Sequence, residues 1–125
     1  MAASFVGTLT MDITIYHNPR CSNSRNTLAA IREAGHEPRI VDYLATPPTR
    51  EELVRMLAAS GLRARDAIRS KESLYAELGL GAEGVDEDAL IDAMLAHPVL
   101  LNRPFVATPK GVRLCRPPET VHEIL

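Results

Sequence analysis

One cysteine of this sequence stands where a thiol can become reactive. Cys21 follows a short segment of alternating apolar residues and comes directly before a segment with helical periodicity, so we expect it at a helix N-terminus. The free N–H groups and partial positive charge of a helix N-terminus stabilise a thiolate and attract anions. His17, Ser24 and Arg25 lie within one or two turns and could hydrogen-bond the sulfur or its target. These neighbours favour a reactive thiolate over an inert buried cysteine.

The surroundings of Cys21 also limit the chemistry that this thiol could perform. A dithiol oxidoreductase has a second cysteine three residues after the first, and Ser24 occupies that position here. A site with one thiol must obtain its second electron donor elsewhere, for example from glutathione. The other cysteine, Cys115, lies at the end of a predicted strand, and we interpret it as a small hydrophobic core residue.

An anionic target of the thiolate would require cations from other parts of the chain. Position 27 is threonine, so the phosphatase-like loop with an arginine six residues after the cysteine is absent. A thiolate about 4 Å from one unit of oxyanion charge is repelled by roughly 4 kcal/mol at an effective dielectric of 20, whereas a helix terminus contributes at most about 2 kcal/mol. Guanidinium groups can supply the difference. Arg69, Arg103 and Arg116 fall at the ends of predicted elements, and they could do so only if the fold brings them together.

The first part of the chain predicts a βαβ unit that would position Cys21. Apolar residues in the segments 12–16 and 39–44 predict two strands. Between them, apolar residues at helical spacing run from Cys21 to about Ala34, and Gly35 occupies a C-cap position. Strands connected in this way are expected to be parallel.

The rest of the chain predicts a helical block followed by a hairpin and a last helix. Residues 49–97 carry helical patterns that begin with a capping box. Segments 105–107 and 112–115 flank a turn with proline and glycine, which is typical of a β-hairpin, and the prolines at 117 and 118 begin the last helix. The order βαβ then ββα resembles an α/β thioredoxin-like fold with a helical insertion at about residues 49–97. We expect residues 11–125 to form a single domain and residues 1–10 a flexible extension.

Composition excludes several other classes of protein. The 125 residues are 46% hydrophobic and 24% charged, and no apolar run approaches the roughly 20 residues of a membrane helix. The net charge of −2 gives no general attraction to nucleic acid. The histidines lack ligand spacing with the cysteines, so we expect no metal site. Two distant cysteines form no disulfide scaffold, and the first ten residues lack the Lys or Arg of a secretory signal, so we expect a cytoplasmic protein without nucleic-acid or membrane partners.

Several linked motifs resemble those of the glutaredoxin-dependent arsenate reductases of the thioredoxin-like superfamily. The resemblance spans nearly everything from Ile13 to Leu125. The motifs are Ile15-Tyr16-His17-Asn18-Pro19-Arg20-Cys21, Ser24-Arg25-Asn26-Thr27-Leu28, Tyr43-Leu44, Thr46-Pro47-Pro48-Thr49-Arg50, Leu78-Gly79-Leu80, Leu101-Asn102-Arg103-Pro104 and Leu114-Cys115-Arg116-Pro117. Their common order is far more specific than any single motif.

The resemblance implies a role for each candidate residue. Cys21 would be the nucleophile, and His17 with Ser24 would favour its thiolate. The oxyanion site would consist of Arg69, Arg103 and Arg116. Pro104 matches the cis-proline that faces the catalytic cysteine in this superfamily.

The implied reaction is the reduction of arsenate to arsenite. Cys21 would attack arsenate, glutathione would displace arsenic in its trivalent state, and glutaredoxin would reduce the remaining mixed disulfide. Arsenate, glutathione and glutaredoxin are therefore the expected partners, with glutathione as co-substrate and no bound cofactor or metal.

Two other functions remain open from the sequence. A glutathione-dependent thiol/disulfide reductase of the same superfamily would need Cys21 but not three arginines. A non-enzymatic redox regulator of the Spx type, which binds RNA polymerase, generally carries a Cys-x-x-Cys switch that Ser24 removes here.

Overall fold

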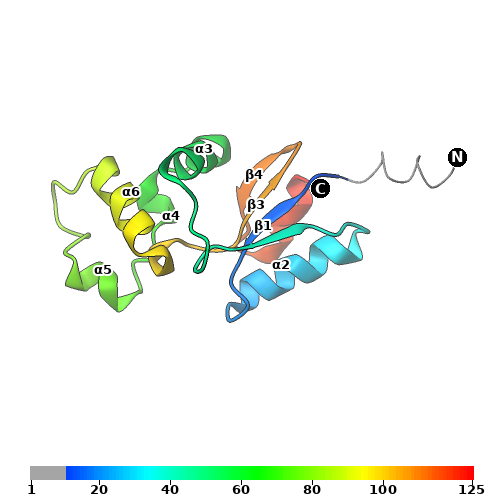
Figure 1. The fold of residues 1–125 in the computed structure, drawn as a ribbon, viewed down its shortest axis with the longest axis horizontal. Coiled ribbons are helices and arrows are strands. Elements are labelled where there is room, and N and C mark those ends of the chain that lie inside the picture. Colours follow the sequence, from blue (N-terminus) through cyan, green and yellow to red (C-terminus); the bar gives the residue numbers. More distant parts are fainter. Residues whose placement is uncertain (1–10) are drawn as a thin grey trace, which may run out of the picture.

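The computed structural model describes residues 11–125 and places a four-stranded sheet beside a group of short helices (Figure 1). The predicted flexible extension, residues 1–10, lies outside the described residues. The strands are β1 (Thr14–His17), β2 (Arg39–Asp42), β3 (Phe105–Thr108) and β4 (Gly111–Leu114), in the spatial order β2-β1-β3-β4. β1 pairs with β2 in parallel, whereas the β1–β3 and β3–β4 pairs are antiparallel. This arrangement confirms the predicted βαβ unit and hairpin.

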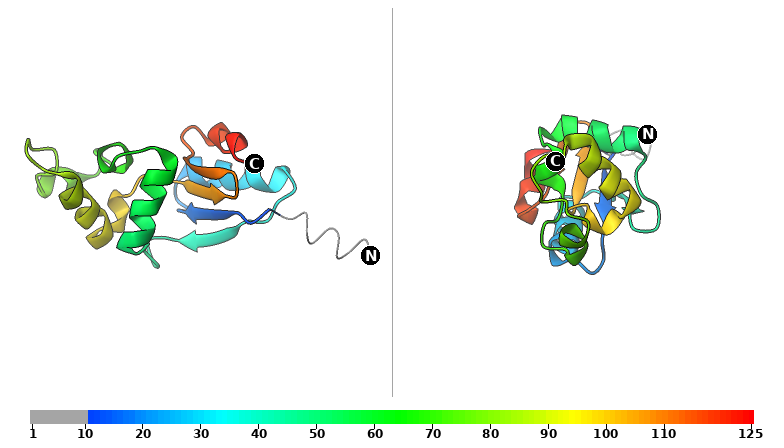
Figure 2. Two further views of the ribbon diagram at one scale, coloured as in Figure 1. Left: turned by 90° about the horizontal axis from the view of Figure 1, so that it is seen from above. Right: turned by 90° about the vertical axis from the view of Figure 1, so that its left-hand side faces the viewer.

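One face of the sheet is covered by helix α2 (Ser22–Glu33) and the 3₁₀ helix η2 (Pro118–Glu123), which lie against each other (Figure 2). Alternate residues of the central strands point to this face, so Ile15 and Val106 are fully buried there. Ile31 from α2 and Val121 from η2 complete the same core. This core therefore holds β1, which precedes Cys21 in the chain, against α2, which follows it.

The opposite face carries helix α3 (Arg50–Ser60), which packs against β4. The predicted capping box is present, because the Thr49 hydroxyl accepts a hydrogen bond from the Glu52 N–H while the Glu52 carboxylate accepts one from the Thr49 N–H. The helix ends at Gly61, whose φ of 72° is a left-handed conformation that favours glycine.

The predicted helical block is confirmed between β2 and β3. After α3 it contains α4 (Ala64–Ala67), α5 (Ser73–Glu77), α6 (Glu87–Ala96) and the 3₁₀ helix η1 (Pro98–Leu100). Arg50 forms ion pairs with Asp88 and Asp92, which link α3 to α6. The chain then returns to the sheet through Leu101, which pairs with Ile68 in an isolated antiparallel bridge. None of the helices within residues 11–125 has the length and apolar character needed to cross a membrane.

The boundaries of some elements differ from the sequence prediction. β2 ends at Asp42 rather than at residue 44, because the Asp42 carboxylate accepts hydrogen bonds from the N–H groups of Leu44 and Ala45 and turns the chain. The last helix is a 3₁₀ helix, in which the Thr120 N–H donates to the Pro117 carbonyl.

Candidate active site

The Cys21 thiol lies at the N-terminus of α2, as the sequence predicted. The loop between β1 and α2 is a tight turn in which the Cys21 N–H donates to the Asn18 carbonyl at 3.0 Å. Cys21 is the N-cap residue with extended backbone angles, and its carbonyl accepts the first helical hydrogen bond from Arg25. The side chain is half-buried, so the sulfur is close to the helix end and still accessible.

The surroundings of Cys21 favour its thiolate. Partial burial raises the pKa of the thiol, but the backbone N–H of Ser24, the side chain of Arg103 and the backbone N–H of Asn23 together lower the pKa below its ordinary value of 9.0. The sulfur makes no regular cap hydrogen bond, so these groups act mainly as nearby positive dipoles and charge. A thiolate is the nucleophilic form of cysteine.

His17 and Ser24 form a hydrogen-bonded pair beside the cysteine. The buried Ser24 hydroxyl accepts a hydrogen bond from the Asn18 N–H at 3.0 Å and lies 2.6 Å from the Nδ1 atom of His17. A serine hydroxyl can both donate and accept, so this pair forms with either tautomer of the imidazole. Burial lowers the pKa of His17, which favours its neutral ring. In the described part of the chain neither side chain hydrogen-bonds the sulfur, so the Ser24 backbone acts on the thiol while its hydroxyl binds the preceding loop.

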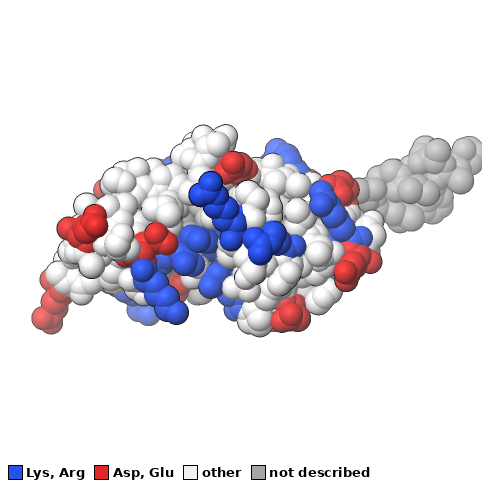
Figure 3. Space-filling view, turned by 90° about the horizontal axis from the view of Figure 1, so that it is seen from below, with Lys and Arg blue, Asp and Glu red and all other residues white. Residues whose placement is uncertain are grey.

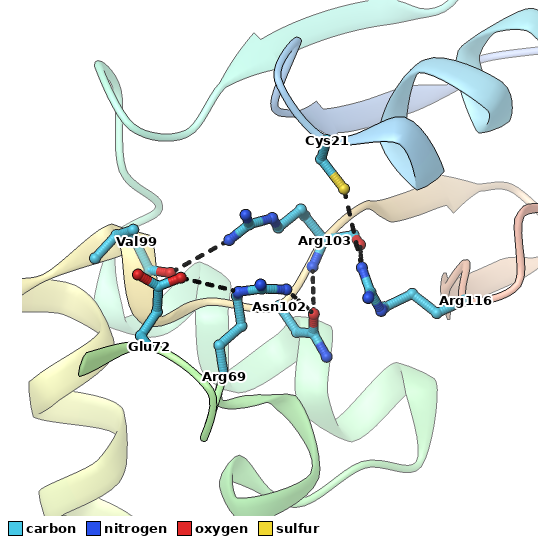
Figure 4. Close-up of polar contacts among 7 residues, drawn as sticks. All are labelled: Cys21, Arg69, Glu72, Val99, Asn102, Arg103 and Arg116. Carbon is cyan, nitrogen blue, oxygen red and sulfur yellow. Dashed lines mark hydrogen bonds and ion pairs between the residues drawn. The ribbon is translucent and has the colours of Figure 1, made fainter. Parts of the chain in front are cut away.

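The structure brings Arg69, Arg103 and Arg116 together near the cysteine, although they come from distant parts of the sequence (Figure 4). A terminal nitrogen of Arg116 lies 3.9 Å from the Cys21 sulfur and donates to the Arg103 carbonyl at 2.9 Å. The Asn102 Oδ1 atom accepts hydrogen bonds from the Arg103 N–H at 3.1 Å and from the Arg69 guanidinium at 3.3 Å. Asn102 therefore connects two of the arginines.

The arginines keep unused hydrogen-bonding capacity. Arg103 donates one long bond, of 3.4 Å, to the Val99 carbonyl, and its Nε atom is buried without a partner among residues 11–125. Arg69 pairs with Glu72 at 3.4 Å, also a long contact. A buried donor without an acceptor is costly and uncommon in folded proteins. The Arg103 Nε atom is therefore a donor that an acceptor from outside the chain could satisfy.

Pro104 follows Arg103 directly and precedes β3. The Arg103–Pro104 peptide bond is cis, as the resemblance implied, and the bond between Arg116 and Pro117 is also cis. The Pro104 carbonyl accepts a hydrogen bond from the Cys115 N–H at 2.9 Å. Phe105 pairs with Tyr16 in the antiparallel β1–β3 pair, so the preceding residue, Pro104, lies opposite His17. His17 is the last residue of β1, and the loop that leads to Cys21 begins after it.

Cys115 is completely buried in the core beneath α2 and η2. Burial is the main reason that its pKa is raised to about 12, and Glu123 raises it further. This confirms the interpretation of Cys115 as a core residue.

A pocket of about 240 Å³ adjoins the cysteine through Arg116. It is lined by Ile68, Arg69, Ser70, Lys71, Asn102 and Arg116. Within residues 11–125, no group of three or more His, Cys, Asp or Glu side chains could hold a metal ion.

Sequence reasoning assigned no role to two residues of the site. Asn102 joins Arg69 to Arg103, and Tyr43 lies just beyond β2, where burial raises the pKa of its hydroxyl and the nearby Arg103 charge opposes the shift. Both belong to motifs that carry the family resemblance, and this membership was the available signal.

Comparisons with known proteins agree with the fold. Residues 16–124 match the ArsC family. The chain is 59% identical over 115 residues to an arsenate reductase of Rhizobium meliloti, covering 92% of this chain and 82% of that protein. It is 56% identical over 114 residues to an arsenate reductase of Escherichia coli K12, covering 91% and 81%.

A solved structure, described as arsenate reductase from Vibrio cholerae, superimposes on this fold with a TM-score of 0.89 at 47% identity and covers 93% of this chain and 99% of that one. The long match in sequence and the close match in structure extend over the sheet, the helical block and the segments that supply the cysteine and the three arginines. The chain belongs to the ArsC family.

Proposed function

We propose that this protein reduces arsenate to arsenite, with the Cys21 thiolate as the nucleophile. The observation that carries the proposal is the position of one thiol of lowered pKa, at a helix N-terminus, beside guanidinium groups from two distant segments. Arsenate carries negative charge, as the thiolate does, and the arginines offset the repulsion that would otherwise keep them apart. The names of the similar proteins from Rhizobium meliloti and Escherichia coli support this substrate.

The remaining candidate residues take supporting roles. Arg103 and Arg116 would bind the oxygens of arsenate next to the sulfur, with Arg69 at the outer side of the site. Ser24 would stabilise the thiolate through its backbone N–H, and the hydroxyl bond to His17 would hold the loop that carries Cys21. Pro104 would hold Arg103 at the end of the sheet.

The electrons would come from thiols outside this chain. Cys115 is buried and its pKa is about 12, so it is a poor partner for Cys21. Glutathione would attack the Cys21–arsenate adduct, leaving a Cys21–glutathione disulfide and trivalent arsenic, and glutaredoxin would reduce the disulfide. Such a reaction belongs in the reducing cytoplasm.

A coupled assay with arsenate, glutathione and glutaredoxin, each omitted in turn, tests this function. We expect arsenite only when arsenate and both thiol reductants are present, and none with the Cys21→Ser variant. Turnover of a disulfide substrate without arsenite formation would instead indicate a thiol/disulfide reductase.

Variants of the arginines separate the two reductase functions further. Arg103→Ala and Arg116→Ala should raise the KM for arsenate or lower kcat. Arg63→Ala should have no effect, because this exposed arginine pairs, among residues 11–125, only with Asp66. Unchanged arsenate kinetics in both site variants would exclude the arginine site.

A further inference from the structure

The pocket beside the arginines extends beyond what a tetrahedral oxyanion needs. Its volume of about 240 Å³ is slightly below the roughly 300–1,000 Å³ of pockets for drug-sized ligands. It therefore suits one end of a small molecule in addition to an ion of five heavy atoms. Arg116 stands at the cysteine end of the pocket, since it contacts the Cys21 sulfur.

The lining of this pocket is strongly cationic. Arg69, Lys71 and Arg116 contribute three positive charges, and no Asp or Glu is among the lining residues. Arg69 is partly neutralised by Glu72, but Lys71 has no ion pair or hydrogen bond from its side chain in the part of the chain that the structure describes. Figure 3 shows Lys and Arg side chains gathered across the middle of one face, with Asp and Glu mostly toward its edges.

A second anionic group is available from the chemistry of the proposed reaction. The thiol that attacks the Cys21 adduct must bring its sulfur to the cysteine end of the pocket, and glutathione carries a carboxylate at each end of the molecule. One residue of extended chain spans at most about 3.6 Å. The glycine carboxylate of glutathione therefore lies a few ångströms from its sulfur-bearing residue, and Lys71 lines the same pocket as Arg116, which contacts the Cys21 sulfur.

We propose that Ser70 and Lys71 form a carboxylate-binding subsite for glutathione, at the outer end of the pocket whose inner end holds the oxyanion. This inference deepens the proposed function and rests on it for the identity of the thiol. Lys71 would bind the carboxylate as a point charge, and the Ser70 hydroxyl would donate a hydrogen bond to it. The subsite would orient the thiol toward Cys21 without taking part in arsenate binding.

The test uses the full chain and a reaction that does not depend on arsenate. Oxidised glutathione reacts with the Cys21 thiolate to form a Cys21–glutathione mixed disulfide and to release one reduced glutathione. Bis(2-hydroxyethyl) disulfide undergoes the same exchange but carries no carboxylate. The rate of each reaction is measured by mass spectrometry for the wild-type protein and for Lys71→Ala, Lys71→Arg and Lys71→Glu. Lys110→Ala is the matched control, because the exposed Lys110 lies in the turn between β3 and β4, binds the Leu125 carbonyl and does not line the pocket.

We expect Lys71→Ala to slow the reaction with oxidised glutathione about two- to fivefold, the range for an exposed ion pair, and Lys71→Glu to slow it more. Lys71→Arg should restore the rate, and the uncharged disulfide should react equally with all variants. In the arsenate assay, Lys71→Ala should raise the KM for glutathione and leave the KM for arsenate unchanged.

Three results would overturn the subsite. The first is an equal rate with oxidised glutathione in wild type and Lys71→Ala, and the second is a changed KM for arsenate in Lys71→Ala. The third is a changed KM for glutaredoxin alone in that variant, which would assign the lysine to a protein partner. If the wild-type chain forms no arsenite but the charge effect on oxidised glutathione is present, the proposed function fails and the glutathione subsite stands.

Discussion

The Ser24→Ala substitution separates the two contributions that this residue makes to the site. The Ser24 hydroxyl is fully buried and holds two groups, the Asn18 N–H at 3.0 Å and the His17 ring at 2.6 Å. Its backbone N–H, by contrast, is one of the groups that lower the pKa of Cys21. Alanine removes the hydroxyl and keeps the N–H.

The expected loss of stability can be worked from these two bonds. A typical hydrogen bond contributes about 1 kcal/mol, and a buried donor left without a partner costs about 1–3 kcal/mol. We therefore expect the free energy of unfolding to fall by about 2 kcal/mol, which lowers the Tm of a chain of this size by roughly 6–10 °C. The pKa of Cys21 should remain below its ordinary value, because the groups that lower it are still present.

Two measurements check this expectation. Thermal or urea unfolding followed by circular dichroism gives the stability, and the pH dependence of Cys21 alkylation by iodoacetamide gives the thiol pKa. Ser22→Ala is the matched control, because Ser22 is exposed on the first turn of the same helix. A pKa of Cys21 that rises in Ser24→Ala while the Tm is unchanged would refute the reasoning, since it would mean that the hydroxyl acts on the sulfur.

Three further expectations follow from burial and charge. Cys115→Ser should retain arsenate reduction. In the native wild-type protein, iodoacetamide at pH 8 should label only Cys21, as measured by peptide mapping. Labelling of Cys115 at a similar rate would contradict its burial. The folded-state pKa of His17 is below 6.5, so the folded protein favours the neutral ring. The stability that the neutral ring contributes is therefore present above about pH 6.5 and is lost as the pH falls through the folded-state pKa. In urea unfolding between pH 7.5 and 5, His17→Gln should lose less free energy of unfolding than the wild type. Deletion of residues 1–10 should leave the Tm and the activity unchanged, whereas deletion through Met11, which packs against the core beneath α2, should lower the Tm.

Local sequence signals correctly predicted those features of the fold that depend on residues close together in the chain. The capping box at Thr49, the helix end at Gly61 and the placement of Cys21 at the start of α2 were all confirmed. Each depends on backbone groups within a few positions along the chain. The end of β2 was predicted two residues too late, because the side chain of Asp42 competes for the backbone N–H groups that would have continued the strand.

Local sequence signals could not predict which side chains form hydrogen bonds with one another in the site. The sequence placed His17, Ser24 and Cys21 close together, and the family resemblance implied that both neighbours favour the thiolate. Only the tertiary structure shows that the Ser24 hydroxyl turns toward Asn18 and His17 rather than toward the sulfur. Side chains at such short spacing have several partners within reach, and packing decides among them.

The sequence by itself determined that this chain has one thiol at a helix N-terminus, no resolving cysteine three residues later, and a βαβ–ββα order with an intervening helical block. Only the tertiary structure decided that Arg103 and Arg116 lie beside that thiol, and that Asn102 links Arg69 to Arg103. The physical reason is separation along the chain: periodicity and caps report interactions over a few residues, whereas convergence of distant cations depends on how the helical block returns to the sheet. The same return creates the cationic pocket at Lys71, which no local pattern in the sequence indicates.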